Sequence, residues 1–217
     1  MPFYVELKGS NGKTVYDTTL RNFSLISRQR VMVSSGSGVL INIPNPLTTC
    51  PFARIDGNYE PNVCLFGGIQ EGKMGLMLAP KLADGGSITR PVIVYFMGVG
   101  TTGLQPEYGA VIRNANNVIE WSSLDNPLFI RTAPVTAAAA NPGTSLGLSG
   151  PIATTPSIAG MASRSGGGGI FSAMTGFSNG LYSAGLGNPN GSGNWTWNTS
   201  LMPKLDTQVY IDTGFMD

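Results

Sequence analysis

The chain has 217 residues, enough to bury a substantial core in one domain with at most a small appendage. Its 13 basic and 12 acidic residues give a net charge of +1 and form no Lys/Arg cluster that could follow a phosphate backbone, so no nucleic-acid partner is expected. Histidine is absent, which removes the commonest general base and the usual metal ligand.

Charged residues make up only 12% of the chain, against roughly 25% in typical soluble domains. No apolar run approaches the roughly 20 residues of a helical membrane span, so no span is expected. A surface this poor in charge has two interpretations: other subunits cover much of it, or Gly, Ser, Thr and Asn keep it soluble through neutral polar groups. The amino terminus has neither the basic segment nor the apolar core of a signal peptide, so none is expected.

Residues 3–28 predict a β-hairpin. Side chains alternate between polar and apolar over residues 4–8 and 15–18, which is the two-residue period of a strand. Asn11 and Gly12 separate the two runs, and this pair favours the positive φ angles of a tight hairpin turn.

Short apolar segments bounded by turn residues predict further strands over residues 31–33, 38–43, 62–66, 75–79 and 91–97. The last of these contains VIVYFM, the most apolar run of the chain, and is therefore predicted to be a central strand. Residues 44–61 hold several prolines and predict a long irregular loop. No window before Arg131 keeps a helical apolar stripe, so residues 1–131 are predicted to form one domain, an antiparallel β-sandwich built from hairpins.

Residues 108–131 repeat the first hairpin 105 positions further on, without gaps. In this alignment Leu7 matches Ile112, Tyr16 matches Trp121, and Asn116 begins the turn. The repeat is either a duplication or a chance similarity of two hairpins, and both interpretations predict a second hairpin. We expect the two ribbons to pair or face each other and so close the sandwich.

The composition changes at Thr132. Residues 132–203 carry a single charge, Arg164, and 14 of the 30 glycines of the chain. This predicts a Gly/Ala/Ser-rich and mostly irregular extension or arm over residues 132–206. Its large apolar side chains indicate that it becomes ordered against its own β domain or against a neighbouring subunit. Residues 207–217 alternate again at their start and predict one strand that returns to the sheet.

Five aromatic side chains of this extension are candidates for an interaction surface: Phe171, Phe177, Tyr182, Trp195 and Trp197. Flat apolar faces among Asn and Gly suit the recognition of a sugar or a protein. The alternative is that they form a small core for the carboxy-terminal region.

Motifs that suggest chemistry have simpler explanations. The run from Gly98 to Gly103 resembles a dinucleotide-binding fingerprint, but that motif requires a helix to begin there and a second hairpin is predicted instead. Gly12, Lys13 and Thr14 resemble the end of a phosphate-binding loop, but Leu7 stands where that motif needs a glycine.

Titratable side chains suggest no catalytic site. Asp56, Glu60 and Glu71 lie in or near predicted loops, and two carboxylates suffice for glycan hydrolysis. Acids in loops, however, are mostly solvated surface charges. Cys50 and Cys64 would pair only if neighbouring strands bring them close, and two cysteines in a chain without a secretion signal are more often buried reduced thiols. Without histidine they do not indicate a zinc site. We therefore expect no catalytic residues, no cofactor, no metal and no enzymatic activity.

The first hairpin resembles the start of small tailed-bacteriophage virion proteins, which begin with a strand such as GLxVxN followed by xGxxxxDS. The matching residues are MPFYVEL at 1–7, NGK at 11–13 and VYDT at 15–18, although Tyr4 stands where the pattern has glycine. The second copy keeps Gly109 and Asn114 of that pattern. The resemblance covers less than a third of the chain.

This resemblance implies a β-sandwich that is a non-enzymatic structural component of a phage particle, at the tail tip, the baseplate or the fibre attachment. It implies other virion proteins and copies of the chain as partners, and location in the virion. Two alternatives stay open: a receptor-binding module that contacts a host glycan or protein, and a capsid decoration protein.

Overall fold

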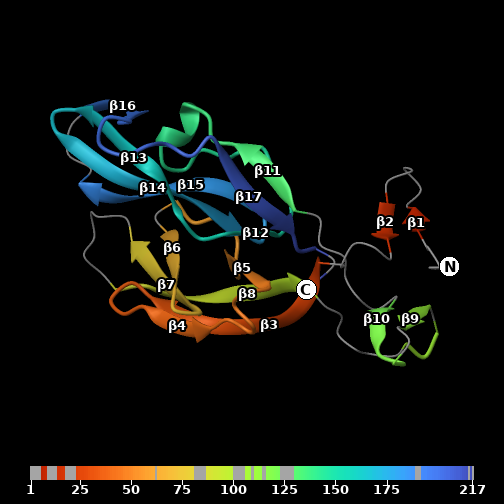
Figure 1. Ribbon diagram of the computed structural model, residues 1–217. Helices are drawn as coiled ribbons and strands as arrows, with labels where there is room; N and C mark the ends of the chain where they lie inside the picture. Colours follow the sequence, from red (N-terminus) through yellow and green to blue (C-terminus); the bar gives the residue numbers. More distant parts are fainter. Residues whose placement is uncertain are drawn as a thin grey trace.

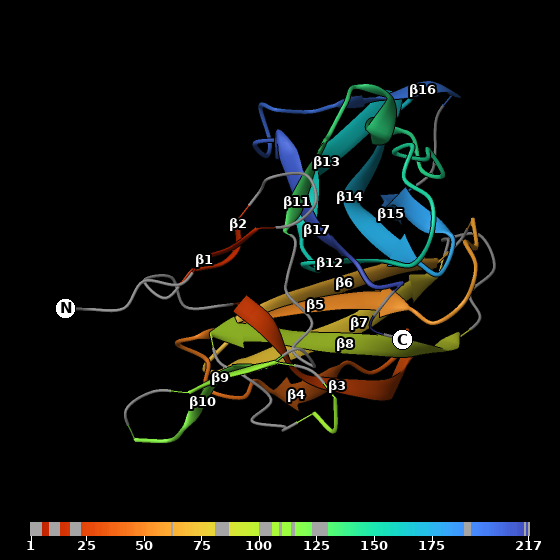
Figure 2. The ribbon, with the colours of Figure 1, turned by 90° about the vertical axis from the view of Figure 1, so that its right-hand side faces the viewer.

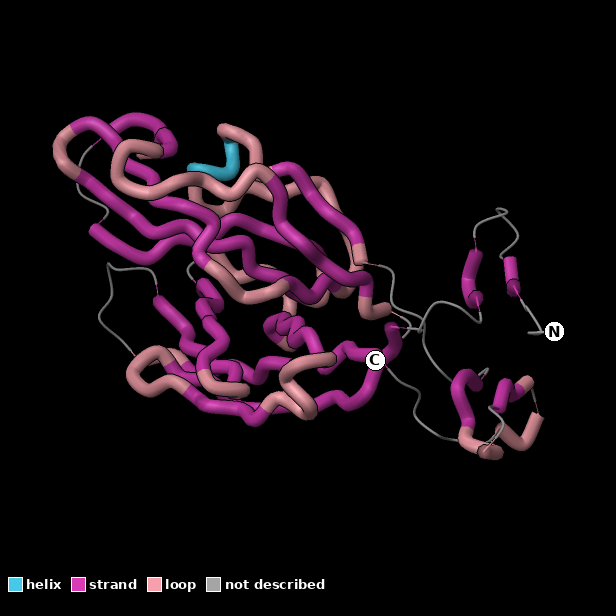
Figure 3. Tube along the Cα trace, viewed as in Figure 1, coloured by secondary structure: helices cyan, strands magenta, loops and turns pink. Residues whose placement is uncertain are grey.

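The computed structural model describes residues 6–8, 14–17, 23–61, 63–80, 87–99, 106–108, 110–113, 116–122, 130–188, 192–214 and 216. Within these residues every regular element is a β-strand, apart from the short 3-10 helix η1 (Ala138–Ala140). Figure 3 shows strands over most of the described chain, joined by loops. The predicted all-β class is confirmed.

The described strands pair antiparallel throughout and form three larger sheets and two ribbons. A six-stranded sheet has the order β11-β17-β12-β5-β8-β3, a four-stranded sheet β15-β14-β13-β16 and a three-stranded sheet β4-β7-β6, while β1-β2 and β10-β9 are two-stranded (Figure 1). The bounds are β1 Glu6–Lys8, β2 Thr14–Asp17, β3 Phe23–Ser34, β4 Val39–Asn42, β5 Thr49–Ile55, β6 Val63–Gln70, β7 Lys73–Pro80, β8 Thr89–Val99, β9 Val111–Arg113, β10 Ile119–Ser122, β11 Arg131–Pro134, β12 Ile152–Thr154, β13 Ile158–Ser165, β14 Gly168–Phe177, β15 Gly180–Asn188, β16 Ser192–Trp197 and β17 Thr207–Asp212.

Strand β8 carries the VIVYFM run and lies between β5 and β3, as predicted for a central strand. Its side chains alternate between the two faces of the six-stranded sheet, and both faces are buried. On one face, β8 shares a core with the three-stranded sheet, and its members include Val33, Ile55, Leu65, Leu76, Leu78, Val92, Val94 and Phe96. On the other face lies a cluster that includes Phe52, Ile93, Tyr95, Met97, Ile211 and Met216.

The four-stranded sheet packs against the same face of the six-stranded sheet as the three-stranded sheet does. Ala53 belongs to the first core and pairs with Thr154 of β12. Ile152, two residues earlier in β12, therefore points to the same side. It lies in a second core with Met174, Leu181 and Tyr210. The molecule is thus a layered sandwich in which one long sheet supports two shorter ones (Figure 2).

The prediction of a long irregular loop over residues 44–61 is wrong in its centre. Strand β5 runs from Thr49 to Ile55 and pairs with β8 along its length, including Pro51 with Phe96. On its other edge β5 pairs with β12 through Ala53 alone, so most of that edge is not paired with a described strand. A proline in β5 therefore interrupts no hydrogen-bonded ladder on that side.

The prediction of a mostly irregular segment over residues 132–206 is also wrong. This segment contains β12 to β16 and most of β11, and its strands pair with one another, with β5 and with β17. It is therefore ordered against its own chain, the first of the two alternatives. The predicted final strand is confirmed as β17, which lies between β11 and β12. The six-stranded sheet joins strands from both sides of residue 131. The domain boundary at that residue stays a prediction.

Both predicted hairpins are present as ribbons, and their registers match. Glu6, Leu7 and Lys8 pair with Asp17, Tyr16 and Thr14. The positions 105 residues further on make the same three pairs: Val111 with Ser122, Ile112 with Trp121, and Arg113 with Ile119. The turn of the second ribbon contains Asn117 at a φ of 61°. The turn of the first, at Asn11 and Gly12, lies outside the described residues.

The ribbons do not close the sandwich as expected. Each forms a two-stranded sheet of its own, and no other described strand pairs with either. Figure 1 shows both on the same side of the larger sheets.

A glycine at the contact of β12 and β14 offers a direct test of the packing. A Cβ at Gly176 would collide with the carbonyl oxygen of Ile152, whereas one at Gly57 would meet nothing within 4 Å. We expect Gly176→Ala to lower the free energy of unfolding by about 3 kcal/mol, because the two backbones must separate. Gly57→Ala should change it by less than about 0.5 kcal/mol. Urea unfolding of both variants measures the difference, and equal effects would contradict the close approach of β12 and β14.

Candidate functional site

The outer face of the three-stranded sheet carries exposed apolar side chains, among them Leu40 and Met77. Alternate side chains of this sheet, including Ile41, Leu76 and Leu78, point into the first core. Their neighbours point outward, and the cross-strand pairs Leu40 with Gly75 and Phe66 with Met77 lie on that outer face. Sheets of this kind often have one solvated face, but a solvated face is normally polar.

A hollow of about 350 Å³ lies over this face, lined by Gly38, Val39, Leu40, Phe66, Gly67, Gly75, Leu76, Met77 and Ile158. None of these residues is charged. Gly75 forms part of the floor, and a Cβ there would lie 3.5 Å from Cδ2 of Leu40. A second hollow of about 460 Å³ shares Leu40 and Gly75 and has a polar end with Glu71 and Lys73.

The apolar surface continues onto the four-stranded sheet. Ile158 lines the hollow and pairs across β13 and β14 with Ala173. Ala173 belongs to a small cluster with Phe66, and Phe171 lies two residues from it on the same face of β14. We call Leu40, Phe66, Met77, Ile158 and Phe171 the apolar strip. Leu40 is 73% exposed, and Met77, Ile158 and Phe171 are between 37% and 42% exposed.

The structure separates the five predicted surface aromatics. Phe177 is fully buried in the first core. Tyr182 lies against it with ring centroids 5.9 Å apart. Trp195 is 9% exposed, and the Arg164 guanidinium lies 4.6 Å from its ring centroid. Trp197 packs beside Trp195, and its Nε1 donates to the carbonyl oxygen of Thr136. Phe171 is the most exposed of the five and belongs to the apolar strip.

Sequence reasoning missed Leu40, Phe66, Met77 and Ile158. Both faces of β7 are apolar over much of KMGLMLAP, a pattern typical of a strand that is covered on both sides. That pattern is the sequence signal of the apolar strip, because the structure covers the outer face of β7 only in part.

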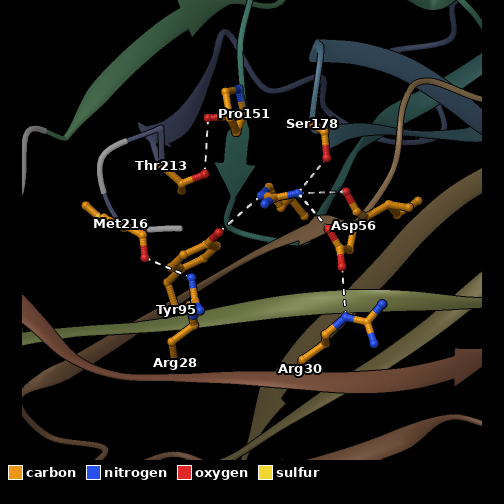
Figure 4. A network of polar contacts seen from close by, with 10 residues as sticks. Arg28, Arg30, Asp56, Tyr95, Pro151, Ser178, Thr213 and Met216 are labelled. Carbon is orange, nitrogen blue, oxygen red and sulfur yellow. Dashed lines mark hydrogen bonds and ion pairs between the residues drawn. The ribbon is translucent and has the colours of Figure 1, made fainter.

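A polar network links the sheets through Arg54 of β5, whose side chain is 4% exposed. Its Nε donates to the Tyr95 hydroxyl at 3.1 Å, and its Nη1 donates to Ser178 Oγ at 2.8 Å. Asp56 lies 3.6 Å from that Nη1 and accepts a 2.8 Å bond from Nε of Arg30 (Figure 4). Ser178 belongs to the turn between β14 and β15, so the network fastens the four-stranded sheet to β5.

The carboxyl end of the chain is fastened on the face of the six-stranded sheet that carries Tyr95, opposite the three-stranded sheet. Nη1 of Arg28 donates to the Met216 carbonyl oxygen at 2.9 Å. The Thr213 hydroxyl donates to the carbonyl oxygen of Pro151 at 3.2 Å (Figure 4). The Met216 side chain is buried in the cluster around Tyr95.

The loop carboxylates considered for glycan hydrolysis take part in ion pairs or lie in a turn. Asp56 pairs with Arg30 and Arg54. Glu60 accepts two bonds from Arg90, at 2.8 and 2.7 Å. These hydrogen bonds lower the pKa of Glu60, so it is ionised at neutral pH and is poorly suited to act as a general acid. Glu71 lies in the turn between β6 and β7.

The two thiols are free, and Cys64 is buried while Cys50 is partly buried. Burial raises the pKa of Cys64 to about 12 and also raises the pKa of Cys50, so neither is poised as a thiolate. Among the residues that the structure describes, no group of three or more Cys, Asp and Glu could hold a metal ion. No helix of this part of the chain is long and apolar enough to cross a membrane. Gly98 lies in β8, and residues 100–103 of the glycine run lie outside the described ranges.

The chain matches no known protein family, no curated protein and no solved structure. Its function is therefore inferred from the geometry of its own surface.

Proposed function

We propose that the protein is a non-enzymatic subunit that assembles with copies of itself through the apolar strip. The observation that supports this is the exposure of Leu40, Met77 and Ile158 around one uncharged hollow. Contiguous apolar patches larger than a few hundred Å² are uncommon on monomers and typically mark a binding face. Covering it gains about 25 cal/mol for each Å² of apolar area removed from water.

The position of β4 favours a protein partner over a small molecule. Among the described strands β4 pairs with β7 alone, so it is the outer strand of its sheet. A strand added beside β4 would continue the ladder through main-chain hydrogen bonds. Its side chains would lie beside Leu40, which is the most exposed residue of the apolar strip.

We further propose that this assembly is part of a tailed-bacteriophage particle, near the tail tip, baseplate or fibre attachment. Support comes from the resemblance of the first hairpin and from the second ribbon, which pairs in the same register. Other virion proteins would then be the remaining partners. An antibody against the chain should label the tail end of particles that carry the gene. Label on the head would favour a decoration protein, and unlabelled particles would contradict the placement without affecting self-assembly.

Substitutions in the apolar strip test the assembly. Met77→Lys places a charge on the proposed interface, so we expect the molar mass from light scattering to fall toward that of a monomer. Met32→Lys is the matched control. Met32 is 55% exposed, and its neighbours Val31 and Val33 contact the first core, so it points to the opposite face of the six-stranded sheet. It should leave the mass unchanged.

Two results would contradict the proposal. One is a wild-type chain that remains monomeric at the highest attainable concentration. The other is an oligomer that Met32→Lys dissociates and Met77→Lys does not.

A further inference from the structure

Tyr59 and Tyr182 form a stacked pair that the proposed assembly does not use. Tyr59 lies in the connection between β5 and β6, and Tyr182 lies on β15. Their ring centroids are 4.1 Å apart and their planes differ by 16°. Phe177 meets both rings edge-on, at 5.4 Å from Tyr59 and 5.9 Å from Tyr182.

Backbone hydrogen bonds near the pair hold the two rings against each other. The amide of Tyr59 donates to Oδ1 of Asn179 at 2.8 Å. The amide of Ser178 donates to the carbonyl oxygen of Gly57 at 2.8 Å. These bonds tie the turn between β14 and β15 to the connection that carries Tyr59. The two phenols are thus held together by the fold, which gives them a high effective concentration for each other.

The two rings reach the surface, but there is little spare room at the Tyr59 hydroxyl. Both tyrosines are partly exposed. Gly143, at a φ of +91°, lies against Tyr59, and a Cβ there would be 2.7 Å from the hydroxyl oxygen. Burial, and then the neighbouring Tyr182 phenol, raise the pKa of Tyr59. At neutral pH the ring is therefore a protonated phenol, which loses its proton together with the electron on oxidation.

We propose that Tyr59 and Tyr182 are a modification site that closes into an intramolecular dityrosine when a one-electron oxidant acts on the folded protein. Each phenol gives one electron to an oxidant equivalent and one proton to water. The two tyrosyl radicals then form one carbon–carbon bond between ring positions next to the hydroxyls. The hydrogens on these two carbons move to the oxygens, which restores both aromatic rings. The product is lighter by two hydrogen atoms, and two equivalents of oxidant are reduced.

Such a bond would join the β5–β6 connection to β15 covalently. It would add to the Ser178 contacts that already fasten the four-stranded sheet to β5. The inference does not rest on the proposed assembly, because it requires one folded chain only.

The full-length chain is illuminated at low concentration with ruthenium tris(bipyridine) and persulfate, which together act as a one-electron oxidant. We expect dityrosine fluorescence on the monomer, the loss of two hydrogens by mass spectrometry, and a linked peptide pair that contains Tyr59 and Tyr182. Tyr59→Phe and Tyr182→Phe keep the ring stack and remove one hydroxyl, so each should fold normally and abolish the monomer signal. The circular dichroism spectrum and melting temperature of each variant confirm folding.

Tyr108→Phe is the matched control, because Tyr108 is 87% exposed and its ring has no place in the stack. It should retain the monomer signal and reduce only cross-links between chains. The same reaction in denaturing urea should lose the Tyr59 to Tyr182 peptide pair. A wild-type chain without monomer-borne dityrosine, or a monomer signal that survives Tyr182→Phe, would overturn the proposal.

Discussion

Replacing Arg54 by alanine is expected to lower the free energy of unfolding by about 3 kcal/mol. The substitution removes a buried guanidinium that donates to Tyr95 and Ser178. Hydrogen bonds to a charged group contribute about 1.5–3 kcal/mol each, and the lost stem leaves a cavity. The fastening between β5 and the four-stranded sheet should weaken accordingly. Urea unfolding followed by circular dichroism measures the effect.

Arg30→Ala is the matched control for Arg54→Ala. Arg30 also pairs with Asp56, but its side chain is 61% exposed. Exposed ion pairs typically contribute 0 to about 1 kcal/mol, so the loss should stay below about 1 kcal/mol. If Arg30→Ala destabilised the chain as much as Arg54→Ala, the burial of the network would not be the source of its effect.

Phe177→Ala should cost about 3–5 kcal/mol of unfolding free energy, the usual range for a buried phenylalanine. Phe177 is fully buried in the first core and its ring also meets Tyr59 and Tyr182. The cavity would open where the turn between β14 and β15 meets the three-stranded sheet. Thermal and urea unfolding both report the loss.

Phe171→Ala is the comparison within the same strand. Phe171 is 42% exposed, and surface substitutions usually change stability by less than about 0.5 kcal/mol. The same variant should weaken self-association, because Phe171 belongs to the apolar strip. Equal losses of stability at Phe171 and Phe177 would contradict the division of these aromatics into one core residue and one surface residue.

Local patterns predicted the elements whose signals are local. The apolar run in β8 indicated a central strand, and the alternation of residues 207–213 indicated β17. The ribbons followed from turn residues and from a repeat whose alignment agrees with the pairing in both copies.

The carboxy-terminal third was not predictable in the same way. Its strands are rich in glycine and alanine, so their outward and inward positions differ little in polarity. They pack through close approaches at glycines instead. The backbone of Gly176 lies against that of Ile152, and the side chains of Ile170 and Pro142 lie against Gly185. Composition suggests an irregular segment wherever such contacts replace large side chains.

The apolar strip escaped prediction because its residues come from β4, β6, β7, β13 and β14. Their proximity depends on contacts between strands far apart in the sequence, such as those of the cluster that holds Phe66 of β6 and Ala173 of β14. A sequence shows that β7 is apolar on both faces, but the tertiary arrangement decides how much of the second face is covered. Of the five aromatics proposed for the surface, the structure therefore places Phe177 in the core and Phe171 in the strip.

The self-assembly of this face is tested most directly by amide hydrogen exchange of the wild-type chain, compared between a dilute and a concentrated solution. We predict that amides of β4, from Val39 to Asn42, gain protection on concentration, together with those of β7 beside Met77. Protection that rises only in β3, from Phe23 to Ser34, or exchange that is identical at both concentrations, would contradict assembly through the apolar strip.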